Sequence, residues 1–297
     1  MTSSFISPEP QLIPQATTAR PVPRAAARAS TPDGRRGLGA VADYATQLLA
    51  VTDTELRKLR HDPMELVTRA IQPALWLILF GTVMGRVRGL STISGIRYID
   101  FLAPGILSQS VLFAAIFYGI SVIWERDLGI LQRYLVSAAP RSTFVLGKAL
   151  SSPVRGLVQA VIVYVIASAM GIALSLNPLN LLAVAVFIGI GSALFSTFSL
   201  VVACLVKTRE RFMGIGQVIT MPIFFASNAI YPIHLMPHWL QIVSRLNPLT
   251  YEADALRAFM LKGGVSTLGI GMDFAVLMVT FSFFAWCAVR LCPRMAA

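Results

Sequence analysis

The sequence predicts an all-α integral membrane protein, and three observations lead to this fold class. Of its 297 residues, 56% are hydrophobic and only 13% are charged, whereas a soluble domain has about 25% charged residues. The mean hydropathy is +0.70. Six stretches are apolar over the length of about 20 residues that a helix needs to cross a bilayer core. The charges fall mainly between these stretches, as expected for loops.

The six predicted transmembrane helices share long apolar runs without a charge in the middle. They are residues 70–87, 101–124, 156–176, 179–206, 212–233 and 273–291. The first is the shortest of the six.

The distribution of Lys and Arg predicts the orientation, because short cytoplasmic loops hold the excess of these residues. A cytoplasmic N-terminus places fourteen Lys and Arg residues near the inner side of the spans and six near the outer side. We therefore expect a multi-pass protein of the cytoplasmic (inner) membrane with both termini in the cytoplasm. The loop between the second and third spans is then cytoplasmic.

Two parts of the chain differ in composition. The first forty residues contain six prolines and five arginines, without an apolar run that could form the core of a signal peptide. We interpret residues 1–42 as a disordered cytoplasmic tail and residues 43–297 as one membrane domain. An organelle transit peptide is the alternative, but the prolines disfavour the amphipathic helix that such a peptide needs.

Several function classes lack support in the sequence. The net charge of +11 belongs to loops and tail, with no interleaved basic and aromatic residues that would suit nucleic acid. Cys204, Cys287 and Cys292 show no paired spacing, so we expect no disulfide or metal site from them. His234 and His238 could bind a metal, but two loop histidines are more typical of solvated surface. We expect no catalytic, cofactor-binding or metal-binding residue.

The energy source is the next question. A gradient-driven transporter usually keeps ionisable residues near the middle of its spans, and the predicted spans have none, although Ser192, Ser196 and Thr197 could coordinate an ion. The stretch STFVLGKAL fails as a phosphate loop, because Ser142 replaces the first glycine and Ala149 follows Gly-Lys. ATP and magnesium, if used, would bind a partner chain. A gradient-driven transporter and a non-transporting scaffold remain alternatives.

A charged segment, ERDLGILQRYLVSAAPRSTFVLGKAL, occupies residues 125–150 between two apolar spans. Leu128, Leu131 and Leu135 follow helical spacing, and Pro140 ends the periodic part. Such a helix could dock its apolar stripe into a groove on a partner, or it could lie flat on the lipid. Periodicity leaves both interpretations open.

Three stretches of the chain resemble the type-2 permeases of ABC transporters, which include drug, nodulation-factor and polysaccharide exporters. The stretch LRKLRHDPMELVTRAIQPALWLILFG is similar to the amphipathic entry helix and first span of that family. The segment at residues 125–150 is similar to its loop between spans two and three, with matches at Glu125, Arg126, Gly129, Pro140, Arg141, Gly147 and Lys148. The stretch between spans five and six matches at Pro232, Met236, Pro237, Trp239, Leu240, Asn247, Pro248, Leu249, Thr250, Tyr251, Asp254 and Arg257. Asn228 and Ala229 depart from the glycine that relatives often place before the outer turn.

The resemblance implies a six-span permease domain over residues 43–297, with an N-terminal interfacial helix and short extracellular helices between spans five and six. It implies a second permease subunit, as a homodimer or heterodimer, and two separate ATPase subunits. It also implies a cytoplasmic coupling helix that contacts the ATPase through Glu125, Arg126, Leu128, Gly129, Leu131 and Leu135. The outer signature would comprise Pro232, Pro237, Trp239, Asn247, Pro248, Tyr251, Asp254 and Arg257.

The cargo is predicted only as a class. Apolar and small hydroxyl side chains without fixed charge suit a lipophilic or amphiphilic molecule, such as a drug, a lipid or a glycan-lipid. The sequence therefore predicts an exporter subunit, in contact with membrane lipid, whose ATP is hydrolysed elsewhere.

Overall fold

The computed structural model describes residues 44–291, except for 51, 55–56, 58–62, 85–91, 94–95, 130–140 and 207. Its elements are α2 (Pro63–Met84), β1 (Thr92–Ile93), β2 (Ile96–Arg97), α3 (Tyr98–Asp127), α5 (Arg141–Ala169), α6 (Pro178–Leu205), α7 (Arg209–Phe225), η1 (Ile233–Leu235), α8 (His238–Leu246), α9 (Pro248–Met260) and α10 (Ile270–Leu291). Residues 44–50 and 52–54 are also helical. The predicted tail at residues 1–42 lies outside the described residues.

The described chain is nearly all helical and multi-pass, which confirms the predicted class in its coarse form. Four helices are long and apolar enough to cross a membrane, namely α3, α6, α10 and residues Ser142–Ala169 of α5. In α2, residues Ile71–Met84 form a shorter apolar stretch. The layout with six spans therefore stays a prediction for α2 and α7. The strands β1 and β2 pair antiparallel over two residues each.

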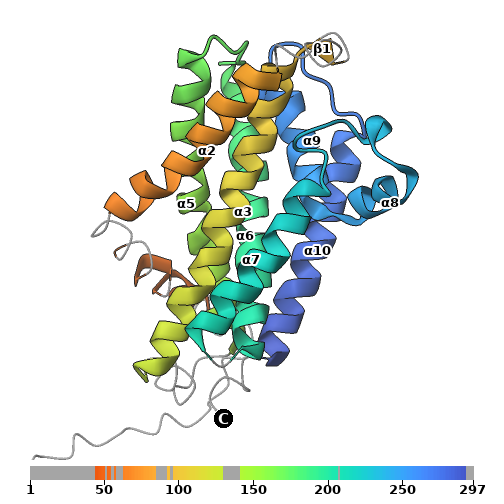
Figure 1. The fold of residues 1–297 in the computed structure, drawn as a ribbon. Coiled ribbons are helices and arrows are strands. Elements are labelled where there is room, and N and C mark those ends of the chain that lie inside the picture. The colour runs from red at the N-terminus through yellow and green to blue at the C-terminus, as the bar shows by residue number, and fades with distance from the viewer. Residues whose placement is uncertain are drawn as a thin grey trace, which may run out of the picture. The chain divides into compact units, whose positions relative to one another are not determined.

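Helix α3 lies at the centre of the packed helices (Figure 1). It packs against α2, α5, α6, α7 and α9. The most apolar stretch of α3 is 83% buried, whereas that of α10 is 17% buried. A helix that is apolar all round is expected inside a protein or facing lipid, and α3 and α10 illustrate these two cases.

Small residues allow the spanning helices to approach closely. A β-carbon at Gly119 of α3 would overlap the Ser199 hydroxyl of α6, and that hydroxyl donates to the carbonyl of Ile116 at 2.6 Å. The hydroxyl of Ser196 donates to the Ser152 hydroxyl of α5 at 3.1 Å. Small side chains and interhelical hydrogen bonds are typical of helix association in membranes.

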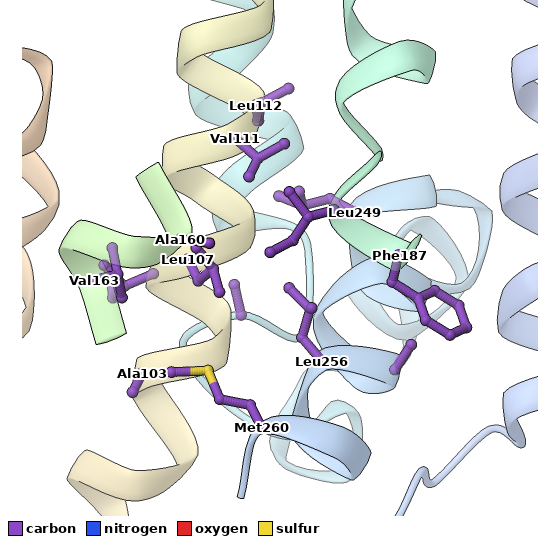
Figure 2. Close-up of a cluster of buried hydrophobic side chains, with 14 of the residues drawn as sticks. Ala103, Leu107, Val111, Leu112, Ala160, Val163, Phe187, Leu249, Leu256 and Met260 are labelled. Atoms are coloured by element: carbon purple, nitrogen blue, oxygen red, sulfur yellow. The ribbon is translucent and has the colours of Figure 1, made fainter. Parts of the chain in front are cut away.

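Helix α9 reaches in between the spanning helices. Figure 2 shows Leu249, Leu256 and Met260 of α9 beside Leu107 of α3 and Phe187 of α6. These five residues belong to one buried hydrophobic cluster. A helix lying on the surface of the outer leaflet would not be buried along its length, so residues 248–260 do not form a surface helix of that kind.

Two predicted span boundaries are also wrong. The third span was expected over residues 156–176, but α5 runs from Arg141 to Ala169. The fifth was expected over residues 212–233, but α7 ends at Phe225. Lys148 and Arg155 lower the hydropathy of the first half of α5, so this half was not recognised as part of the span. Their partners, Glu125 and Tyr118, are distant in the sequence.

Candidate functional site

A buried ion pair joins α3 and α5 where the segment 128–140 leaves α3. The ammonium group of Lys148 lies 3.0 Å from Oε1 and 2.9 Å from Oε2 of Glu125. Both side chains are buried. The same ammonium lies 5.0 Å from the ring centre of Tyr118 and 5.3 Å from that of Phe144. Aromatic faces attract a cation. The carboxylate and the two rings therefore stabilise the buried positive charge of Lys148 near the start of α5.

Neighbouring charges connect the last turn of α3 to α6 and α7. Arg126 donates from Nη1 to the carbonyl of Val206, which follows α6, at 3.1 Å. Asp127 forms an ion pair with Arg209 of α7 at 3.0 Å. The guanidinium of Arg209 lies 3.6 Å from the ring centre of Trp124. We call Trp124, Glu125, Arg126, Asp127, Lys148 and Arg209 the junction.

The predicted coupling residues divide into three groups. Glu125 and Arg126 point into the junction. Leu128 is 66% exposed, and Gly129 has a φ of 72°, a left-handed conformation that favours glycine. Leu131 and Leu135 lie outside the described residues. The α3 helix thus ends in a fixed charged turn, and the chain leaves it through an exposed leucine and a glycine turn. The assigned role of these residues stays a prediction.

At the opposite end of α3, residues 233–269 form what we call the cap: η1, α8, α9 and the loop to α10. The side chain of Asn247 accepts a hydrogen bond from the backbone N–H of Leu249 at 3.0 Å and so caps α9. Pro248 occupies the first turn, where a missing N–H has no cost. The amide nitrogen of Asn247 also donates to the carbonyl of Ile223. The predicted Asn-Pro turn therefore starts α9 and ties it to α7.

Arg257 connects the cap to the start of α3. Its guanidinium lies 3.8 Å from the ring centre of Phe101 and donates from Nε to the Phe101 carbonyl at 3.3 Å. Its Nη2 donates to the carbonyl of Asn228 in the turn after α7. Burial lowers the pKa of Arg257 to about 10, and the nearby carboxylate of Asp254 opposes that shift. The side chain thus stays charged at neutral pH and binds two chain segments.

Asp254 holds the loop that leads to α10. Its carboxylate accepts from the backbone N–H groups of Thr267 and Leu268 at 2.8 and 2.9 Å. It also accepts from the hydroxyls of Thr267 and Ser266 at 2.7 and 2.9 Å. A carboxylate with this many donors needs no further partner, so Asp254 serves the cap's own structure.

A cavity of about 490 Å³ opens under the cap. Arg257 and Asn228 contribute to its lining, together with His234, Arg245 and Leu268. Of the remaining predicted signature residues, Pro232 is buried and also lines this cavity, whereas Trp239 is 66% exposed. Pro237 is exposed, and the hydroxyl of Tyr251 donates to the Arg245 carbonyl at 2.6 Å.

A groove lies between α2 and α3. It is lined by Gln72, Gln109, Ser110, Phe113 and Phe117, among others. Gln109 is 2% exposed, and neither atom of its amide has a hydrogen-bond partner among the described residues. The rings of Phe113 and Phe117 stack with their centres 6.4 Å apart. The groove thus combines an unsatisfied amide with aromatic rings.

Sequence reasoning missed Glu252, which is fully buried on α9 with neither carboxyl oxygen hydrogen-bonded in the described part of the chain. A signal was present, because Leu249, Leu256 and Phe259 share its face at helical spacing and make it the only acid in an apolar stripe. His234 and His238 are both exposed. Within the described ranges, no three His, Cys, Asp or Glu residues gather as metal ligands.

Together, the apolar spans, the charged junction at one end and the ordered cap at the other define a multi-pass helical membrane protein of the transporter-permease class. The chain belongs to the ABC-2 type transporter family, whose sequence model matches residues 46–261. The resemblance seen in the three sequence stretches is therefore confirmed.

Named relatives support this membership. A "Putative transport permease ycf38" from Cyanophora paradoxa is 31% identical over 207 residues, 67% of this chain and 69% of the relative. The "Daunorubicin resistance ABC transporter permease protein DrrB1" of Streptomyces coeruleorubidus is 23% identical, covering 78% of this chain and 81% of the relative. "Nodulation protein J" of Rhizobium leguminosarum bv. trifolii is 27% identical, covering 64% and 71% respectively.

Proposed function

We propose that this chain is the membrane permease subunit of an ATP-driven ABC exporter of the cytoplasmic membrane, with both termini in the cytoplasm. It moves a lipophilic or amphiphilic molecule out of the cell with energy from a separate ATPase subunit. Family membership and the relatives' printed names support a transport role.

The junction is the observation that carries this proposal. We call residues 128–140 the docking segment, because they would contact the ATPase. A partner can shift the conformation of the spans only through contacts that differ between the two conformations. The docking segment must therefore be connected firmly to the spans. The turn that leads into residues 128–140 is tied to α5 by Glu125, to the end of α6 by Arg126 and to α7 by Asp127. A displacement of the docking segment would therefore act on three helices at once.

The test uses two exposed leucines, one directly after α3 and one on α8. Leu128→Asp places a charge at the start of the docking segment, and Leu246→Asp makes the same change on α8, where leucine is 80% exposed. We expect the first variant to lose recovery of the ATPase in a pull-down at equal membrane abundance, and the second to retain it. Leu131→Asp, within the predicted apolar stripe, should behave as Leu128→Asp does. Undiminished recovery with both changes would overturn the docking role.

ATP and magnesium are assigned to the partner subunit, because STFVLGKAL lacks the glycine and hydroxyl positions of a phosphate loop. The purified chain should neither bind nor hydrolyse ATP. Specific nucleotide binding by the chain alone would contradict the subunit arrangement.

The groove between α2 and α3 supports an amphiphilic cargo with aromatic rings. Gln109 offers a donor and an acceptor, and Phe113 and Phe117 offer ring faces. Daunorubicin, the drug in the name of the Streptomyces relative, is a suitable probe. Phe117→Ala should reduce ATP-dependent daunorubicin export, whereas Phe283→Ala, on the exposed side of α10, should not. Equal daunorubicin export by both variants would show that this groove is not part of the cargo path.

A second permease subunit is part of the proposal. On α7, Met213, Gln217 and Val218 are exposed, and an amide facing lipid hydrocarbon lacks hydrogen-bond partners. A second copy of this chain, or a related permease, would cover this face. Single cysteines at Met213 should cross-link between copies in membranes if the pair is a homodimer.

A further inference from the structure

Glu252 lies in apolar surroundings inside the protein. Its side chain is fully buried, and its two carboxyl oxygens have no hydrogen-bond partner among the described residues. Leu249 and Leu256, which precede and follow it by about one helical turn, are both packed in the hydrophobic cluster of Figure 2. Burial of an unpaired polar group costs free energy, so the retention of an acid here calls for a function.

The carboxyl group of Glu252 packs closely against α6 at Gly191. A β-carbon at Gly191 would overlap the carboxyl carbon and both oxygens of Glu252. Gly191 lies near the middle of α6, which runs from Pro178 to Leu205. Glu252 therefore brings a carboxyl group to the mid-depth of a spanning helix.

Charged groups on the neighbouring helices do not compensate Glu252. Helix α6 contains no Asp, Glu, Lys, Arg or His. The titratable or charged residues on the other helices packed against α9, and on α9 itself, are Tyr98, Asp100, Tyr118, Glu125, Arg126 and Asp127 of α3, Asp273, Cys287 and Arg290 of α10, His238 and Arg245 of α8, and Tyr251, Asp254 and Arg257 of α9. No hydrogen bond joins any of them to the Glu252 carboxyl in the described chain.

We propose that Glu252 is a proton-binding site: it holds a proton while α9 is packed against α6 at Gly191, and it releases that proton to water when the two helices separate. The ligand is a proton and not a larger cation, because the carboxyl lies so close to Gly191 that even a β-carbon there would overlap it, and no described side chain is hydrogen-bonded to it. Opening of the cap against α6 is then linked to proton release. This inference concerns the packing of α9 and does not depend on the transported molecule.

The direction of the pH dependence follows from burial. Burial raises the pKa of Glu252 well above its ordinary value of 4.5. The packed state then binds more protons than the opened state at every pH between these two values, so its stability falls as pH rises through that window. Above the raised pKa, the full cost of an unpaired buried carboxylate is present. Glutamine at this position has the shape of the protonated acid and no such dependence.

Infrared difference spectroscopy of the full chain in lipid tests the protonation state directly. The wild type at neutral pH should show the C=O stretch of a protonated carboxyl that Glu252→Gln removes. The matched control is Glu210→Gln, the same change at an exposed position in the first turn of α7, and it should leave that band intact. Identical spectra for wild type and Glu252→Gln at neutral pH would overturn the proposal.

Hydrogen exchange of α9 amides tests the link to helix separation. Corrected for intrinsic rates, wild-type exchange should increase by up to about tenfold per pH unit as pH rises from the ordinary pKa of 4.5 to the raised pKa, and it should level off above that. Exchange in Glu252→Gln should depend on pH much less than exchange in the wild type does, and Glu210→Gln should match the wild type. Gly191→Ala keeps the acid but removes its space, so it should raise α9 exchange and lower the midpoint at which the carboxyl band disappears. If wild-type α9 exchange does not depend on pH, or if Gly191→Ala leaves the pH midpoint of the carboxyl band unchanged, the linkage is contradicted. Loss of export alone would bear only on the transport proposal.

Discussion

The ammonium nitrogen of Lys148 lies within 3.0 Å of both carboxylate oxygens of Glu125, and both side chains are buried. A buried ion pair is costly to desolvate, and its mutual attraction compensates that cost only when the geometry is good. Removal of one partner leaves an uncompensated charge. The pair therefore restrains α3 and α5 strongly against any change that separates the two charges.

Lys148→Met should destabilise the protein by about 3 kcal/mol or more, since it leaves Glu125 buried and unpaired. The double variant Lys148→Met with Glu125→Gln should recover much of this loss, because no charge remains. Thermal unfolding in detergent measures both. Arg57→Met serves as the control, because the ion pair of Arg57 with Asp53 is largely exposed and its loss should cost at most about 1 kcal/mol. Equal losses for Lys148→Met and Arg57→Met would argue against a structural role for the buried pair.

This pair also explains which part of the fold the sequence could predict. Long apolar runs were sufficient to identify the membrane class, because hydropathy is a local property. The start of α5 was misplaced because Lys148 and Arg155 look like loop charges. Their partners, Glu125 and the ring of Tyr118, lie in the preceding helix and become neighbours only after folding.

Two Asn-Pro pairs allow the restraint on α9 to be measured. Asn177 caps α6 and Asn247 caps α9, each by accepting from the backbone N–H two residues later. Asn247 also donates to the Ile223 carbonyl, whereas Asn177 is exposed. Asn177→Ala should cost about 1 kcal/mol for the lost cap, and Asn247→Ala about 1 kcal/mol more. Asn247→Asp keeps the cap and loses the donor, so its unfolding free energy should fall between wild type and Asn247→Ala.

Close helix packing gives a second matched comparison. Gly119 faces Ser199 and Phe212 without room for a β-carbon, whereas Gly214 on α7 has open space around it. Gly119→Ala should destabilise by about 1 to 3 kcal/mol through overpacking. Gly214→Ala should stabilise by about 0.5 to 1 kcal/mol, because alanine has the higher helix propensity. A neutral Gly119→Ala in thermal unfolding would mean that α3 and α6 can move apart without cost.

The cap shows the other limit of sequence reasoning. The Asn247-Pro248 pair could be recognised as a chain break because its chemistry is local. The partners of Arg257, which are the carbonyls of Phe101 and Asn228, could not be recognised because backbone acceptors carry no sequence signal. Glu252 was overlooked because the resemblance implied only short extracellular helices here, and the burial of α9 arises from contacts with distant segments of the chain.

Membrane orientation can be tested with two exposed positions that the structure places at opposite ends of α3. Leu128 follows the last turn of α3 and is 66% exposed, and Val265 lies in the cap loop and is 75% exposed. The excess of Lys and Arg near the junction end predicts that this end is cytoplasmic. In a background without Cys204, Cys287 and Cys292, Val265→Cys should react with a membrane-impermeant thiol reagent in intact cells. Leu128→Cys should react only after the membrane is opened.

Both cysteines must react fully in opened membranes, which shows that each is accessible to the reagent. Ser244 would be a poor choice for the cap position because it is fully buried. Labelling of Leu128→Cys in intact cells would reverse the orientation and place the junction outside. An ATPase in the cytoplasm could not then reach residues 128–140, so this result would exclude the proposed docking segment while leaving the packing of α9 against α6 unaffected.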